Sequence, residues 1–104
     1  MMAVERSAIK PAMRAPDFIR TALEALDNRA AIRDQPQGER SAKKAADILS
    51  AWTGKPVEEV DVWRTMIAVK LARESQGAFH ADDLIDLAGY AGLLAECRAA
   101  GEVE

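Results

Sequence analysis

Apolar residues recur at helical spacing along most of the chain, and no segment alternates as a half-buried strand would. A first helix is expected from about Asp17 to Arg33, with Pro16 before it and Asp17 as its cap. Residues three or four positions apart form one apolar stripe on this helix: Ile19, Leu23, Leu26 and Ala30.

A second helix is expected from Glu39 or Ser41 to Thr53, after a break over residues 34–38. Gly54 follows it, in the position where glycine commonly ends a helix. The expected apolar face of this helix consists of Ala45, Ile48, Leu49 and Trp52. Trp52 and, on the next helix, Trp63 both have the spacing of core residues, although either could instead serve as an exposed interface anchor.

The third and fourth helices are expected over residues 57–75 and 81–99, and both are apolar nearly all round in their middle turns. Helices of this kind are usually central and buried. The sequence therefore predicts an all-α fold, a four-helix bundle-like single domain whose last two helices form an antiparallel central hairpin. Their apolar faces exceed what four helices can cover, which favours a homodimer that completes the core.

Two glycines, Gly89 and Gly92, fall inside the fourth predicted helix. Each costs about 1 kcal/mol relative to alanine in that position. We expect them to allow another helix to approach closely. The sequence predicts a helical domain over residues 17–100, with Gly101 ending its last helix. A flexible N-terminal arm is expected over residues 1–16, and a short acidic tail over residues 101–104.

Composition narrows the classes of function. The chain has 104 residues, a net charge of −3 and one cysteine, Cys97. The acidic balance argues against direct nucleic-acid binding, which needs a basic face. No apolar run is long enough for a membrane span, and a lone cysteine fits a reducing cytoplasm. Residues 1–52 nevertheless carry 9 basic against 7 acidic residues, and a small basic surface for a partner is expected at Arg40, Lys43 and Lys44.

Lys70 and Asp86 are charges inside otherwise apolar helical segments. Burying either alone costs several kcal/mol, so each needs a partner. The simplest prediction is an ion pair between them. They could instead line a polar pocket that receives a ligand, or reach solvent at the rim of the helices.

Acidic residues gather at the start of the fourth predicted helix, where His80, Asp83 and Asp86 recur every three positions and share a face. Two carboxylates on one face can hold Mg²⁺ or Mn²⁺, and acidic residues in a first turn also favour the helix dipole. The facing helix offers Lys70 and Arg73. Their charge is wrong for a metal site but right for phosphate or for the aspartates themselves.

Two segments carry a family resemblance over roughly residues 22–97. The first segment is Val69-Lys70-Leu71-Ala72-Arg73, and the second is Asp83-Leu84-Ile85-Asp86-Leu87-Ala88-Gly89-Tyr90-Ala91. They resemble segments of a small all-α family of tailed phages and prophages. That family shows Lys-Leu-Ala-Arg and then Asp-Ile-Ala-Gly-Tyr-Ala. Its aspartate-bearing helix is similar to one helix of the MazG-type nucleotide pyrophosphohydrolases.

The resemblance implies two classes of function. In the first, the chain is a nucleotide pyrophosphohydrolase-like or nucleotide-binding protein, with Mg²⁺ or Mn²⁺ on Asp83 and Asp86 and phosphates on Lys70 and Arg73. MazG-type enzymes also use Glu-x-x-Glu on the preceding helix, and this chain departs from that motif. In the second class, the protein is a cofactor-free binding module, such as a phage-encoded inhibitor that docks on a host defence complex.

Overall fold

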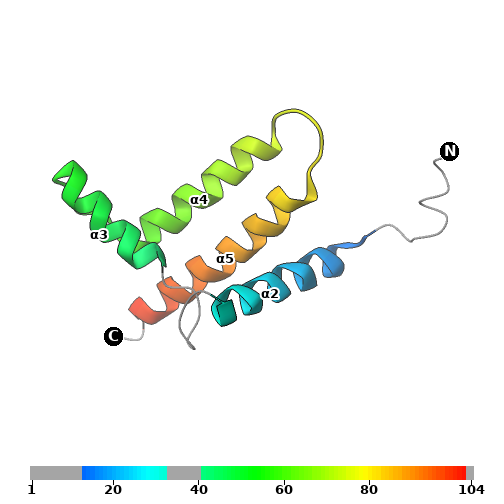
Figure 1. Cartoon of the computed structure of the whole chain (residues 1–104), viewed down its shortest axis with the longest axis horizontal. Coiled ribbons are helices and arrows are strands. Elements are labelled where there is room, and N and C mark those ends of the chain that lie inside the picture. The colour runs from blue at the N-terminus through cyan, green and yellow to red at the C-terminus, as the bar shows by residue number, and fades with distance from the viewer. Residues whose placement is uncertain (1–12, 33–40, 103–104) are drawn as a thin grey trace.

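The computed structural model describes residues 13–32 and 41–102, and four α-helices account for most of them (Figure 1). These are α2 (Ala15–Ile32), α3 (Ser41–Thr53), α4 (Glu59–Glu74) and α5 (Ala81–Glu102). No strand occurs within these residues, so the all-α prediction is confirmed. The predicted arm falls almost wholly on residues 1–12, outside the described part of the chain.

Two helices begin with the same capping arrangement. At α2, the Arg14 N–H donates a hydrogen bond of 2.8 Å to Asp17 Oδ2. At α4, the Glu58 N–H donates one of 2.9 Å to Asp61 Oδ2. Asp17 therefore caps α2 from inside its first turn, and the helix begins two residues earlier than the sequence predicted.

Glycine ends α3 as predicted but does not end α5. Gly54 follows α3 with a φ of +71°, and its N–H donates to the Ser50 carbonyl oxygen at 3.0 Å. A residue with a side chain would be strained there, whereas glycine is not. Gly101 was expected to end the last helix, but α5 continues through it to Glu102. A single glycine costs only about 1 kcal/mol in a helix, so it does not have to stop one.

The hairpin of α4 and α5 lies at the centre of the molecule, as predicted (Figure 1). α2 packs along α5, and α3 packs on α4 and points away from the other helices. Within the described residues, α2 has no close backbone packing with α3 or α4. The four helices therefore form an open, bundle-like arrangement built on one hairpin.

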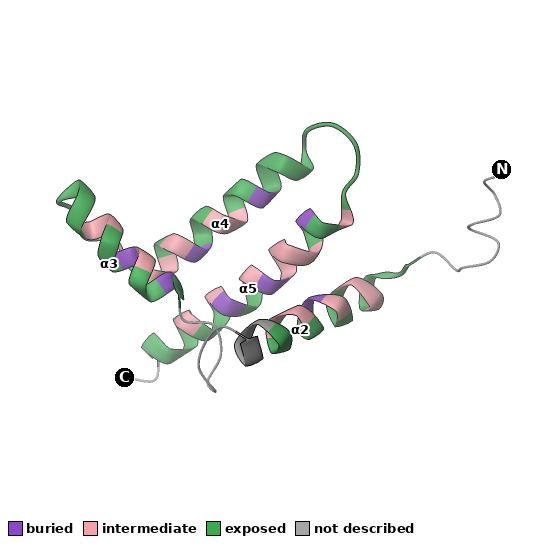
Figure 2. Cartoon of the chain, in the orientation of Figure 1, coloured by how far each residue is buried: buried purple, intermediate pink, exposed green. Residues whose placement is uncertain are grey.

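The core is small and lies where the helices meet (Figure 2). Trp63 of α4 is 4% exposed, and its ring centroid lies 5.7 Å from that of Tyr90 on α5. Trp63 forms the centre of a cluster with Ala42 of α3 and Leu93 of α5, and Leu26 of α2 packs against it. One cluster thus joins all four helices.

Trp52 is not in the core, so this prediction was wrong. Its side chain is 78% exposed on α3, and Ile48, one turn earlier, is 44% exposed. The physical reason is that α3 packs on α4 through its small residues Ala42 and Ala46, which are both 3% exposed. A single neighbouring helix among the described residues covers only part of the circumference of α3, and Ile48 and Trp52 lie on the uncovered part, whereas Leu49 is partly buried.

Gly89 lies where α2 meets α5. A Cβ atom built on Gly89 would be 3.8 Å from the Leu26 side chain, and one built on Gly92 would be 3.9 Å from it. The expected close approach of another helix is therefore present, and that helix is α2. None of the described helices is long and apolar enough to cross a membrane.

Candidate functional site

A charged cluster joins α4 to α5 at the end of the hairpin nearest its loop, and it consists of Lys70, Arg73, Asp83 and Asp86. Lys70 Nζ lies 2.8 Å from Asp86 Oδ2, which is the pairing that the sequence predicted. The same nitrogen lies 3.9 Å from Asp83 Oδ1, and Arg73 Nε lies 3.4 Å from that oxygen. Each cation thus faces an aspartate, and Asp83 is shared between the two cations.

Helix geometry explains why these side chains meet. Lys70 and Arg73 are three residues apart on α4, and Asp83 and Asp86 are three residues apart on α5, so each pair shares one face of its helix. Because the two helices run antiparallel, the last turns of α4 lie opposite the first turns of α5. Lys70 is 9% exposed and Asp83 is 4% exposed, so solvent screens their interaction weakly.

The charged cluster fits mutual neutralisation better than it fits a cation site. Both aspartates already face Lys70 or Arg73, which would repel a metal ion. Within the part of the chain that the structure describes, no group of three or more His, Cys, Asp or Glu side chains is placed to hold a metal. The Mg²⁺ or Mn²⁺ site that the resemblance implies on Asp83 and Asp86 therefore lacks further ligands in these residues.

His80 does not join the charged cluster through its side chain. Its carbonyl oxygen accepts a 3.1 Å hydrogen bond from the Asp83 N–H at the start of α5, and its side chain is exposed. Asp82 is exposed as well. Both residues therefore act at the helix N-terminus, where an acidic side chain favours the dipole.

A second candidate is the α3 surface, which we define as Lys44, Ile48 and Trp52, spaced four residues apart on one face of the helix. All three residues are exposed. Lys43, which the sequence grouped with Lys44, is also exposed but lines a cavity with Glu59 and Cys97 instead. Arg40, which the sequence grouped with the two lysines, lies outside the described residues. The α3 surface thus combines exposed apolar side chains with positive charge.

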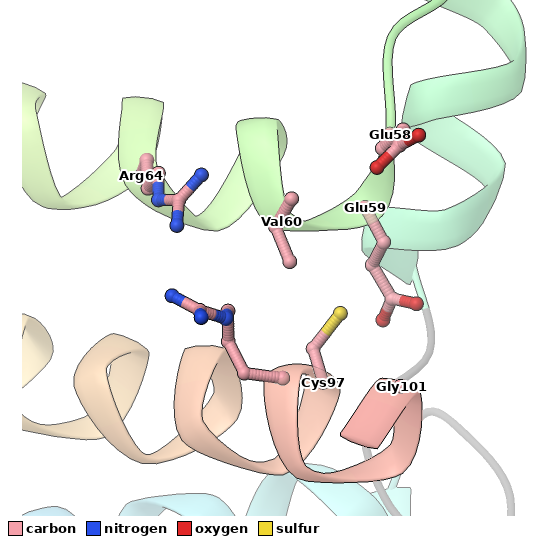
Figure 3. A pocket seen from close by; sticks show the side chains of 7 residues that line it. Glu58, Glu59, Val60, Arg64, Cys97 and Gly101 are labelled. Atoms are coloured by element: carbon pink, nitrogen blue, oxygen red, sulfur yellow. The ribbon is translucent and has the colours of Figure 1, made fainter. Parts of the chain in front are cut away.

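A third candidate lies at the opposite end of the hairpin from the charged cluster, between the start of α4 and the end of α5. It is an open cavity of about 410 Å³. Its lining residues are Glu58, Glu59, Val60, Arg64, Cys97, Arg98 and Gly101. Figure 3 shows Glu58 and Glu59 at one end of this hairpin pocket and Arg64 at the other, with Val60 and Cys97 between them.

Cys97 lies in the hairpin pocket beside Glu59. Burial raises the pKa of the Cys97 thiol, and the negative charge and hydrogen bonding of Glu59 raise this pKa further. Both effects favour the neutral thiol over the thiolate. This agrees with the inert thiol that the sequence suggested.

The sequence did not single out Arg64 or Arg98. They are far apart along the chain, and each reads as an ordinary solvent-facing charge on an amphipathic helix. They could have been found from the register of the antiparallel hairpin. Lys70 pairs with Asp86, so the residue eleven positions before Lys70, Glu59, should lie beside the residue eleven positions after Asp86, Cys97. The structure places these two residues side by side.

The fold is that of a small all-α protein built on a central hairpin, with ion pairs joining α4 to α5 near the hairpin loop. The chain belongs to the family described as "Domain of unknown function (DUF6378)", whose model matches residues 19–98. These residues include most of all four helices.

A relative from a phage supports a phage-type family. The chain is similar to the "Gene 55 protein" of Mycobacterium phage D29, with 38% identity over 50 residues. The match covers 48% of this chain and 33% of the relative, so this chain spans about a third of that protein's length. No solved structure matches the chain.

Proposed function

We propose that this phage-type protein is a non-catalytic binding module that docks on a host protein through the α3 surface. The observation that carries the proposal is Trp52, which is 78% exposed on a well-formed helix. Tryptophan is enriched among the residues that dominate binding energy at protein interfaces, and leaving one in water is unfavourable. A partner that covers Trp52 would recover this free energy.

The α3 surface also indicates what kind of partner would fit. Trp52 and Ile48 are one turn apart, so they form two successive anchors for an apolar groove. Lys44 lies on the same face of the helix, one turn before Ile48. A host protein with an apolar groove bordered by acidic residues would complement both features. The net charge of this chain is −3, which makes the basic α3 surface a local exception.

The hydrolase alternative has less geometric support. Catalysis of pyrophosphate release with Mg²⁺ would use Asp83 and Asp86 as metal ligands, but Lys70 and Arg73 already neutralise them. If the protein hydrolyses a nucleoside triphosphate and this activity requires Asp86, the result would favour the hydrolase over the binding module.

The experiment compares purified wild-type protein with three variants in capture from host lysate. Trp52→Ala removes the apolar anchor, and Trp52→Phe partly restores it. Thr65→Ala, at an exposed position on α4, is the matched control. The captured partner is then purified, and its affinity for each variant is measured by calorimetry.

We expect Trp52→Ala to weaken binding of the purified partner at least tenfold, with partial recovery in Trp52→Phe and no change in Thr65→Ala. Replacing Lys44 with glutamate should slow association most strongly at low salt. Equal affinity for wild-type protein and Trp52→Ala would contradict the proposal. Sedimentation of the isolated protein distinguishes a further outcome, in which a second copy of this chain covers the surface.

A further inference from the structure

We infer that the hairpin pocket binds a compact oxyanion, either free phosphate or the phosphate group of a small ester, between Arg64 and Arg98. This site is separate from the α3 surface and from the charged cluster, and neither the family nor its phage relative assigns it. The inference rests on the convergence of two guanidinium groups, on their lack of partners and on the shape of the cavity.

The two arginines converge because the helices that carry them run antiparallel. Long side chains on a helix lean toward the N-terminus of that helix. Arg64 therefore leans back along α4 toward Val60, and Figure 3 shows it reaching toward the gap between the helices. Arg98 leans back along α5, in the opposite direction in space, and lines the same cavity. Both cations thus line one cavity, Arg64 from α4 and Arg98 from α5.

Neither arginine is neutralised within the described residues. All four acidic or basic members of the charged cluster have ion-pair partners, but no ion pair or hydrogen bond joins the Arg64 or Arg98 side chain to another described residue. Two like charges that share a cavity repel each other. An oxyanion between them would remove this repulsion and could accept a forked pair of hydrogen bonds from each guanidinium group.

The remaining lining residues limit the size of the ligand and the position of its anionic group. Glu58 and Glu59 lie at the end of the cavity away from Arg64, so the anion belongs at the arginine end (Figure 3). Val60 and Cys97 provide an apolar middle, and Gly101 adds no side chain to obstruct the opening. A cavity of about 410 Å³ accommodates a small ester as well as free phosphate.

The test is a titration of ¹⁵N-labelled full-length protein followed by NMR, including the arginine Nε–Hε signals. The probes are inorganic phosphate, glycerol phosphate and, as a test of simple ionic strength, sodium chloride. The variants are Arg64→Gln and Arg98→Gln. Lys55→Gln is the control because it removes the same charge from an exposed position outside the candidate sites.

We expect saturable shifts of the Arg64 and Arg98 signals with at least one phosphate probe and none with chloride. Each arginine variant should weaken binding about tenfold or more, and Lys55→Gln should leave it unchanged. Tighter binding of glycerol phosphate would identify an ester as the better ligand, whereas equal binding would identify free phosphate as sufficient.

Two results would overturn the inference. One is the absence of saturable shifts at these signals in the folded wild-type protein. The other is an equal loss of binding in Lys55→Gln, which would show that overall charge attracts the anion. The unperturbed amide spectrum of each variant establishes that it is folded, since both arginines are exposed. Neither result bears on whether Trp52 binds a partner.

Discussion

Lys70 shows how an apolar helix accommodates a charge. It is buried on α4, yet two aspartates of α5 lie within 4 Å of its nitrogen. This pairing could be predicted because Lys70 and Asp86 each interrupt an apolar segment. The third and fourth members, Asp83 and Arg73, were harder to assign, since an aspartate in the first turn of a helix is also explained by the dipole.

We expect Lys70→Met to destabilise the protein by about 1–3 kcal/mol, because it leaves the partly buried Asp86 without its cation. The double variant Lys70→Met/Asp86→Leu should lose less, since it removes both charges and Asp83 keeps Arg73. Urea denaturation measures both values. A single variant as stable as the wild type would show that the charged cluster does not stabilise the hairpin.

Asp86→Ala separates the structural role of this residue from a catalytic one. If its main role is to pair with Lys70, the variant should lose stability while any nucleotide hydrolysis remains at background in both proteins. A folded, equally stable variant that lacks a hydrolytic activity present in the wild type would instead support the metal-dependent enzyme.

The reactivity of Cys97 should report on its neighbour Glu59. Burial and the Glu59 charge raise the pKa of the thiol. Alkylation of Cys97 by iodoacetamide should therefore accelerate at a higher pH than alkylation of a free cysteine does. Glu59→Gln removes one of these causes, so its pH profile should move to lower pH. Glu74→Gln, at an exposed position at the end of α4, should leave the profile unchanged. Identical profiles for the wild type and Glu59→Gln would contradict this account.

At the scale of the elements, the sequence predicted where each helix lies along the chain more accurately than it predicted which faces of the helices pack together. The bounds of α3 and the glycine that ends it agree with the prediction because local spacing and backbone conformation determine them. The exposure of Trp52 could not be predicted in this way. It depends on which side of α3 meets α4, and the small residues Ala42 and Ala46 allow the closer approach.

The two tryptophans should therefore respond differently to truncation. Trp63→Ala should cost about 3–5 kcal/mol, because it leaves a cavity in the core. Trp52→Ala should change the free energy of unfolding by no more than about 0.5 kcal/mol. Chemical denaturation of the two variants measures the difference. A large loss in Trp52→Ala would show that this side chain is covered in solution.

The α2–α5 contact should tolerate a methyl group but not a larger side chain. The nearest atom to a Cβ at Gly89 would be 3.8 Å away, which is ordinary van der Waals contact. Gly89→Ala should therefore stabilise the protein by about 0.5–1 kcal/mol through helix propensity. Gly89→Leu should push α2 away from α5 and lower the melting temperature. If Gly89→Ala is also destabilising, the helices are closer in solution than this distance indicates.

At the scale of the whole molecule, the pairing of Lys70 with Asp86 sets the register along the entire hairpin. The same register places Arg64 and Arg98 on one pocket, which individual residue patterns did not reveal. The sequence contained this information, but only an antiparallel alignment of the two helices shows it. No such alignment predicted the position of α3, because among the described helices it packs closely on α4 alone. The homodimer remains a prediction that sedimentation can test.

Among the described helices, α2 has its close backbone packing with α5, and this has a consequence for the order in which the protein opens and refolds. The α4–α5 hairpin forms through contacts between neighbouring segments, whereas docking of α2 must close a loop that includes α3 and α4. Undocking α2 exposes only one interface, so it should occur more often than global unfolding. In native-state hydrogen exchange, α2 amides should exchange before those of α4 and α5, through an opening that leaves the hairpin intact.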